Sequence, residues 1–198
     1  MGRKLIIIGA DFTVNAIDRE SYYVDLDYAK VENNNTVFAA LASGSNLYLD
    51  YDIQLLSQPS AGDIYGMGHY LRPLKVQGGY FMIGDFNLMA ADLNRHTFRY
   101  AKTGNTTVVF SSGANTVTKV STYSNNFDFV GVSGISFAYS FQCKIFAVNQ
   151  YSDSTFATKI HSWVPKKYMP QGIIGLYDTI DNRFVVPTTG ELTEDEEE

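Results

Sequence analysis

The fold is decided by the stretch LYLDYDIQL, residues 47–55. Its odd-numbered positions are all apolar or aromatic, and three of its four even-numbered positions are polar or charged. A period of two is typical of a β-strand that buries one face and turns the other to water. Residues 22–28 alternate in the same way, so both stretches are predicted to be half-buried strands.

Runs rich in β-branched and aromatic residues, which favour strands, recur through the rest of the chain. They lie at residues 80–86, 97–101, 107–111, 116–123, 127–139, 142–148, 156–164, 173–177 and 183–186. Clusters of Gly, Asn and Ser separate them, and residues 98–123 are predicted to form three strands joined by two tight loops. A helical stripe is confined to a few residues near 37–42. The pattern predicts an all-β sandwich or barrel.

The charge of the chain is concentrated at its C-terminus. Six of the 21 acidic residues lie in the last eight positions, which leaves 15 acidic residues to balance 15 Lys and Arg in the body. A neutral body without a basic stripe excludes nucleic acid as an expected partner. Residues 191–198 are interpreted as a solvated acidic tail, with docking on a basic patch of a neighbouring subunit as the alternative.

Cysteine and histidine usage predicts neither a disulfide nor a metal site. The single Cys143 is predicted to be a buried core thiol. The three histidines, His69, His96 and His161, are far apart in the sequence and show no ligand spacing. We therefore expect no metal and no cofactor.

The N-terminal segment, residues 1–20, stands apart from the remaining strands. Its apolar run is only four residues long, Leu5, Ile6, Ile7 and Ile8, which is too short for a secretory signal. The sequence also has no apolar run near the 18 residues of a membrane span, so membrane insertion is not expected. These four residues with Phe12 are predicted either to form an edge strand of the same sandwich or to anchor the protein by adding a strand to another chain.

Three stretches of the C-terminal third resemble a known family: FQCKIFAV at 141–148, WVPKK at 163–167 and GLYDTIDNRF at 175–184. Together they are similar to the closing part of the concanavalin A-like, laminin-G-like jelly rolls of bacteriophage fibre proteins and bacterial surface proteins. The opening KLIIIGADF also resembles N-terminal segments of such proteins. The resemblance implies an antiparallel two-sheet jelly roll over residues 21–190, after the anchor segment and before the acidic tail. The two lysines after Pro165 depart from the family pattern, and no ligand site transfers.

The GLYD motif also makes sense from its residues alone. Asp178, Asp181 and Asn182 surround a turn in which short side-chain acceptors can bond backbone N–H groups. Phe184 then returns an aromatic ring to the core. Calcium binding is the alternative for these oxygen ligands and for the pair Asp50 and Asp52, but that pair is predicted to be a solvated strand face.

Catalysis is not expected, although some proteins with this sandwich hydrolyse glycosides with paired carboxylates. The body contains only Glu20 and Glu32, and neither lies in a strand with an alternating acidic partner. A binding role is carried instead by a Gly-rich, loop-like stretch. Its candidate residues for a shallow sugar site are Tyr65, His69, Tyr70 and Arg72. The alternative is that these side chains pack at the sandwich edge or at a subunit interface, and Trp163 is predicted to be core.

Two function classes remain. In the first, the chain is a non-catalytic structural protein of a phage virion, a head or tail fibre or decoration subunit. It would assemble in the host cytoplasm as a homo-oligomer, with a trimer favoured, contact other virion proteins through its N-terminal segment, and bind host-surface glycans. In the second, it is a carbohydrate-binding adhesin module of a bacterial surface. The short apolar run at the N-terminus favours the first class, because an adhesin needs export.

Overall fold

The fold is that of a computed structural model, which describes residues 11–12, 22–32, 46–58, 64–67, 74–83, 86–104, 107–120, 142–187 and 190–195. Every regular element within these residues is a β-strand, and they contain no helix. All pairings between the strands are antiparallel. The predicted all-β, antiparallel fold is therefore confirmed at this level.

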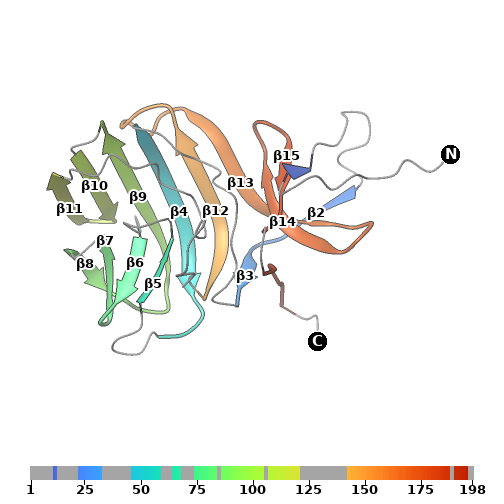
Figure 1. Cartoon of the computed structure of the whole chain (residues 1–198), viewed down its shortest axis with the longest axis horizontal. Helices are drawn as coiled ribbons and strands as arrows, with labels where there is room; N and C mark the ends of the chain where they lie inside the picture. Colours follow the sequence, from blue (N-terminus) through green and yellow to red (C-terminus); the bar gives the residue numbers. More distant parts are fainter. Residues whose placement is uncertain are drawn as a thin grey trace.

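The strands form two sheets (Figure 1). The larger sheet has 11 strands in the order β1-β15-β14-β13-β12-β4-β9-β10-β11, with β2 beside β13 and β3 beside β12. Its strands are β1 (Asp11–Phe12), β2 (Tyr23–Asp25), β3 (Ala29–Val31), β4 (Leu47–Leu55), β9 (Arg95–Thr103), β10 (Thr107–Ser112), β11 (Asn115–Val120), β12 (Cys143–Tyr151), β13 (Lys159–Tyr168), β14 (Ile173–Asp178) and β15 (Arg183–Val185). The smaller sheet contains β5 (Ile64–Met67), β6 (Leu74–Gln77), β7 (Tyr80–Ile83) and β8 (Phe86–Ala90).

The main hydrophobic core contains residues of both sheets. The odd-numbered residues of β4 are buried in it, as their alternation predicts. The smaller sheet contributes Leu74, Val76 and Phe81, and the Phe81 ring lies 4.7 Å from that of Phe98 on β9, centroid to centroid. Each fully buried side chain of this kind contributes about 1.5–3 kcal/mol to folding. The predictions that Cys143 and Trp163 are core residues are confirmed, because neither is exposed.

The three strands predicted within residues 98–123 are confirmed as β9, β10 and β11, which pair in succession. Gly113 occupies the first position of the two-residue loop between β10 and β11, and its φ of 57° requires glycine. The predicted strand at 127–139 and the helical stripe at 37–42 lie outside the described residues. The finer assignment, a jelly-roll sandwich, stays a prediction.

The larger sheet divides where β12 and β13 separate. These strands pair with each other only from Val148 and Trp163 to the β12 end at Tyr151. The other half of β12 pairs with β3, and the other half of β13 pairs with β2. The segment 23–31 therefore pairs with both separated strands, through β3 with β12 and through β2 with β13. Between β2 and β3, the Leu26 N–H donates a 3.2 Å hydrogen bond to the Pro165 carbonyl.

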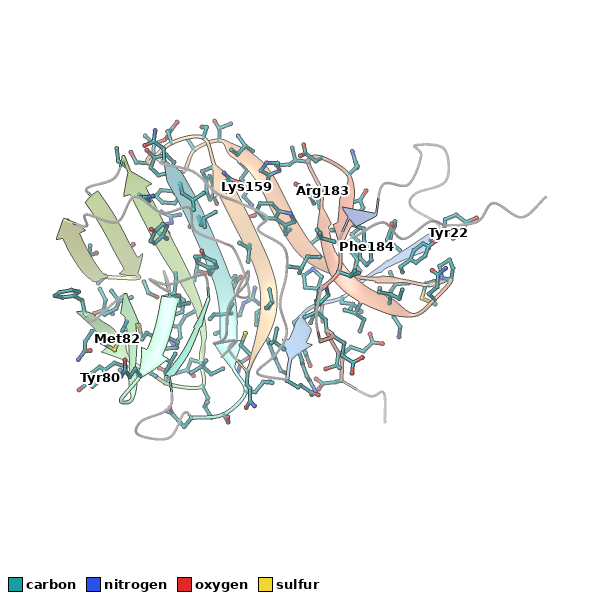
Figure 2. The ribbon with its side chains drawn as sticks, in the orientation of Figure 1. Tyr22, Tyr80, Met82, Lys159, Arg183 and Phe184 are labelled. Atoms are coloured by element: carbon teal, nitrogen blue, oxygen red, sulfur yellow. The ribbon has the colours of Figure 1, made fainter. Side chains whose placement is uncertain are left out.

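A second apolar cluster lies at the β14–β15 end of this sheet. Its buried members are Tyr168, Tyr177 and Phe184, and the Tyr23 ring of β2 packs 5.1 Å from that of Phe184. Figure 2 shows Phe184 beside this strand. A Cβ atom on Gly175 would lie 2.6 Å from the Phe184 ring and 2.5 Å from the Val185 carbonyl oxygen, so glycine permits this close approach.

Candidate functional site

The sequence-predicted sugar site falls mostly outside the described residues. His69, Tyr70 and Arg72 belong to the undescribed part of the chain, so whether they form a site stays a prediction. Tyr65 lies in β5, where it pairs with Val76 of β6. The predicted loop is therefore wrong at this position, because backbone pairing with β6 extends the chain through Gly66 as a strand.

The N-terminal anchor is described only at its end. Phe12 lies in β1 and pairs with Phe184 of β15, which places these residues on an edge of the protein's own larger sheet. Leu5, Ile6, Ile7 and Ile8 lie outside the described residues. Whether they pair with another chain stays a prediction.

A polar and aromatic surface covers the face of β4, β9 and β12 that points away from the core, which we call the outer face. Asp50 and Asp52 alternate with the buried residues of β4, and in the sheet register Asp50 is opposite Arg99 of β9. The prediction of a solvated pair of aspartates is wrong for Asp50, which is only 5% exposed. The reason is that side chains from β9 and β12 enclose it.

The first group on the outer face consists of Asp52, Arg95 and Phe146. Arg95 donates two hydrogen bonds to the Asp52 carboxylate, from Nε at 2.8 Å and from Nη2 at 2.7 Å. These hydrogen bonds to Asp52 raise the pKa of the Arg95 guanidinium above its ordinary value. The guanidinium carbon also lies 3.8 Å from the centre of the Phe146 ring, which stands at a bulge of β12. The guanidinium is thus held by a carboxylate and by a cation–π contact with an aromatic ring.

The second group repeats this arrangement with Asp50, Arg99 and Phe156. Arg99 Nε donates to Asp50 at 3.2 Å, and its guanidinium carbon lies 4.9 Å from the centre of the Phe156 ring. The hydroxyl of Tyr151 donates to the other Asp50 oxygen at 2.7 Å. Burial, and next this hydrogen bond, raise the pKa of Tyr151 to about 12.

Phe156 is held over the sheet by a strained turn. Its φ of 56° is left-handed, which is unusual for a bulky residue and costs about 1–3 kcal/mol. The turn is fixed by Asp153, whose carboxylate accepts bonds from the Thr155 N–H and hydroxyl at 2.8 and 2.5 Å. Its carbonyl also accepts the Phe156 N–H at 3.3 Å. Backbone strain that places one aromatic ring beside an arginine is typical of a functional position.

The two groups form what we call the arginine–aromatic face. Arg95 and Arg99 are four residues apart on one strand, hence about 13 Å apart along it. Both side chains remain about half exposed, at 55% and 53%. The face therefore presents two fixed planar sets of hydrogen-bond donors, each with an aromatic ring beside its guanidinium. In the sequence, the alternation of β4 indicates only that Asp50 and Asp52 share a strand face. The residues that contact these two aspartates lie far away in the chain and cannot be identified from the sequence.

The turn after β14 confirms the structural role predicted for the GLYD motif. Oδ1 of the fully buried Asp178 accepts bonds from the N–H groups of Ser162, Ile180 and Asp181, at 3.1, 3.0 and 3.4 Å. Asn182 Oδ1 accepts a hydrogen bond from the Tyr177 hydroxyl at 3.0 Å. The returning Phe184 is 1% exposed, as expected of a core residue.

His161 joins this turn, although the sequence analysis gave it no role. Its Nδ1 lies 2.6 Å from Asp178 Oδ2 and 3.2 Å from Asp181 Oδ2. Within the described residues this is the one group of His, Cys, Asp and Glu whose donor atoms converge closely enough to hold a metal. Strand register could have indicated it, because His161 precedes Trp163 by two residues and Trp163 pairs with Asp178.

The acidic C-terminal run is attached to the body of the same chain. Thr193 and Lys30 exchange two backbone hydrogen bonds, at 2.7 and 3.1 Å, and Leu192 is buried in the core. Glu194 pairs with Lys167, and Asp195 pairs with Lys30. The interpretation of this run as a solvated tail is therefore wrong for residues 192–194, which are buried or half-buried and contact the core, β3 and β13, whereas Glu191 and Asp195 are exposed.

No family model, curated protein or solved structure matches this chain. Among the residues that the structure describes, no helix is long and apolar enough to cross a membrane. The fold and its side chains thus define an antiparallel all-β protein with an ordered arginine–aromatic face.

Proposed function

We propose that this chain is a non-catalytic structural protein of a bacteriophage particle, whose lectin-like domain binds glycans on the arginine–aromatic face. The observation that carries the glycan part is the repeated arrangement of a carboxylate, a guanidinium and an aromatic ring at Arg95 and Arg99. Sugars offer hydroxyl groups for planar donors and C–H faces for aromatic rings. The spacing of about 13 Å along the strand suits a chain of several sugar units rather than one.

The state of the buried carboxylates supports a binding role over hydrolysis. A glycosidase needs one free carboxylic acid and one free carboxylate flanking the sugar. Asp50 is occupied by Arg99 and Tyr151, and Asp178 is occupied by three backbone N–H groups and His161. Both carboxylates are thus used to hold the protein's own groups in place.

The assignment to a phage particle rests on the resemblance carried by residues 141–184 and on the N-terminal segment. It includes assembly in the host cytoplasm, association as a homotrimer, and contact of residues 1–20 with other virion proteins. The molar mass of the whole chain and of a form lacking residues 1–20, measured by light scattering, tests this part. A trimer that becomes a monomer on truncation supports it, whereas a monomer in both cases contradicts the fibre-subunit assignment.

A glycan array probed with the purified full chain tests the binding part. The variants R95A and R99A each remove one planar donor set without changing a buried residue. We expect each to lose at least tenfold in affinity for any glycan that the unmodified protein binds. The matched control is K166A, because Lys166 also pairs with an aspartate, Asp25 at 2.8 Å, and lies over an aromatic ring, Tyr177, away from this face.

Two results would contradict the proposal. Glycan binding that is unchanged in the R95A/R99A double variant would remove the arginine–aromatic face from the account. Release of reducing sugars from a bound polysaccharide would contradict the non-catalytic assignment.

A further inference from the structure

Three metal-ligating side chains converge at the end of β14, away from the arginine–aromatic face. His161 projects from β13, Asp178 ends β14, and Asp181 lies in the following turn. One imidazole nitrogen of His161 and one oxygen of each carboxylate lie within 4.8 Å of one another. We propose that His161, Asp178 and Asp181 bind a divalent transition-metal cation, with Zn²⁺ as the preferred ion.

The separations of the donor atoms fit a small cation. In a tetrahedral Zn²⁺ site with bonds of about 2.0–2.1 Å, neighbouring ligand atoms are about 3.3 Å apart. His161 Nδ1 and Asp181 Oδ2 are already 3.2 Å apart. The 2.6 Å separation between His161 Nδ1 and Asp178 Oδ2 is that of a hydrogen bond, and it would open by about 0.7 Å on metal binding.

The types of ligand select the class of metal. Two carboxylates around one neutral imidazole give the cluster two negative charges, which a divalent cation neutralises. Ca²⁺ and Mg²⁺ prefer oxygen ligands alone, whereas an imidazole with carboxylates suits Zn²⁺ and its neighbours in the first transition series. Arg183, the register partner of Asp178 on β15, adds one positive charge at this end of the sheet and leaves the group net negative (Figure 2).

The groups behind the ligands hold them in position. Three backbone N–H groups fix Oδ1 of Asp178, so its other oxygen is directed at His161. The Trp163 indole stacks on the His161 ring, with centroids 5.0 Å apart and planes at 22°. Metal ligands in proteins are usually held in position by hydrogen bonds from such groups behind them. Asp181 is 52% exposed, which gives a cation access from solvent.

Trp163 makes the site directly observable because it is the only tryptophan in the chain. The experiment uses the untagged full chain after treatment with EDTA. ZnCl₂ is titrated by calorimetry, and NiCl₂ or CuCl₂ is titrated while the tryptophan emission is recorded. We expect saturable binding of one Zn²⁺ per chain, and quenching of Trp163 by Ni²⁺ or Cu²⁺ at the same stoichiometry.

Two variants and a control decide the assignment. H161Q and D181N should each weaken Zn²⁺ binding at least about tenfold, as loss of a ligand requires. D92N is the matched control: His96 Nε2 lies 2.7 Å from Asp92 Oδ1, close to the 2.6 Å of the His161–Asp178 pair, and outside the proposed site. Its Zn²⁺ affinity should equal that of the unmodified protein.

Circular dichroism and the urea midpoint show whether each variant is folded, and the half-exposed position of Asp181 makes D181N the safer of the two. No saturable Zn²⁺ binding, or Zn²⁺ binding by H161Q and D181N that equals that of the unmodified protein, would overturn the proposal. The cluster would then be only an ion pair between a histidinium and two carboxylates.

Discussion

Asp50 and Asp178 are both buried carboxylates, yet their surroundings differ in kind. Asp178 bonds mainly to backbone N–H groups of its own turn and of the adjacent strand. Asp50 bonds to the side chains of Arg99 and Tyr151, which lie 49 and 101 residues away in the sequence. A carboxylate that satisfies backbone donors holds a turn together. A carboxylate that orients an exposed arginine fixes the side chains of a surface. Because of this difference, we place the proposed binding on the outer face.

The largest expected effect is on stability at Asp178. D178A leaves three partly buried N–H groups without their acceptor, and an unsatisfied buried group costs about 1–3 kcal/mol. We predict that D178A lowers the free energy of unfolding by about 3 kcal/mol or more, measured by urea denaturation. D178N keeps one carbonyl acceptor and should lose less. Equal losses of unfolding free energy in D178A and D178N would show that the negative charge of Asp178 contributes more to stability than its acceptor oxygen.

D50A should be less damaging than D178A. It removes the partners of Arg99 and Tyr151, but Arg99 is about half exposed and can be solvated instead. We predict a loss of about 1–2 kcal/mol in urea denaturation, together with greater mobility of the Arg99 side chain in NMR relaxation. A loss as large as that of D178A would contradict the distinction between the two carboxylates.

The third prediction concerns alkaline pH. The pKa of Tyr151 is raised from 10.0 to about 12, because burial and the bond to Asp50 favour the neutral phenol. A raised pKa means that the stabilisation is complete below pH 10 and is lost as the pH rises from about 10 to 12. In Y151F, unfolding free energy measured across this range should fall less steeply. Tyr51 and Tyr100, whose pKa values burial also raises, continue to contribute in both proteins.

The smallest effect is expected at the acidic run. Glu194 and Asp195 pair with lysines whose side chains are partly exposed, and such pairs contribute about 0–1 kcal/mol each. E194Q/D195N should therefore lower the unfolding free energy by less than about 1 kcal/mol, and added salt should abolish the difference. L192A should cost more, because Leu192 is buried in the core. The reverse order would show that the charges, not the core contact, hold this segment.

The same two carboxylates show what the sequence could and could not predict. The turn around Asp178 is local, so the residue types at Asp178, Asp181 and Asn182 could predict a turn, and Phe184 could be predicted as a core residue. The strands within 47–55 and 98–123 could be predicted because their patterns are also local. The arginine–aromatic face could not, because it depends on which distant strands become neighbours and in which register. The His161 cluster lies on the consecutive strands β13 and β14, and only the register of that pair reveals it. A one-residue shift between β4 and β9 would place Arg99 on the opposite face from Asp50.

Our central claim is that Asp50 orients the side chains of the proposed binding surface, whereas Asp178 stabilises the fold. The most direct test measures glycan binding and urea stability side by side in D50N and D178N. We predict that D50N loses most of its affinity for the bound glycan with a small change in stability. D178N should lose stability while its folded fraction keeps the affinity of the unmodified protein. The opposite pattern, or unchanged glycan binding in D50N, would contradict the claim.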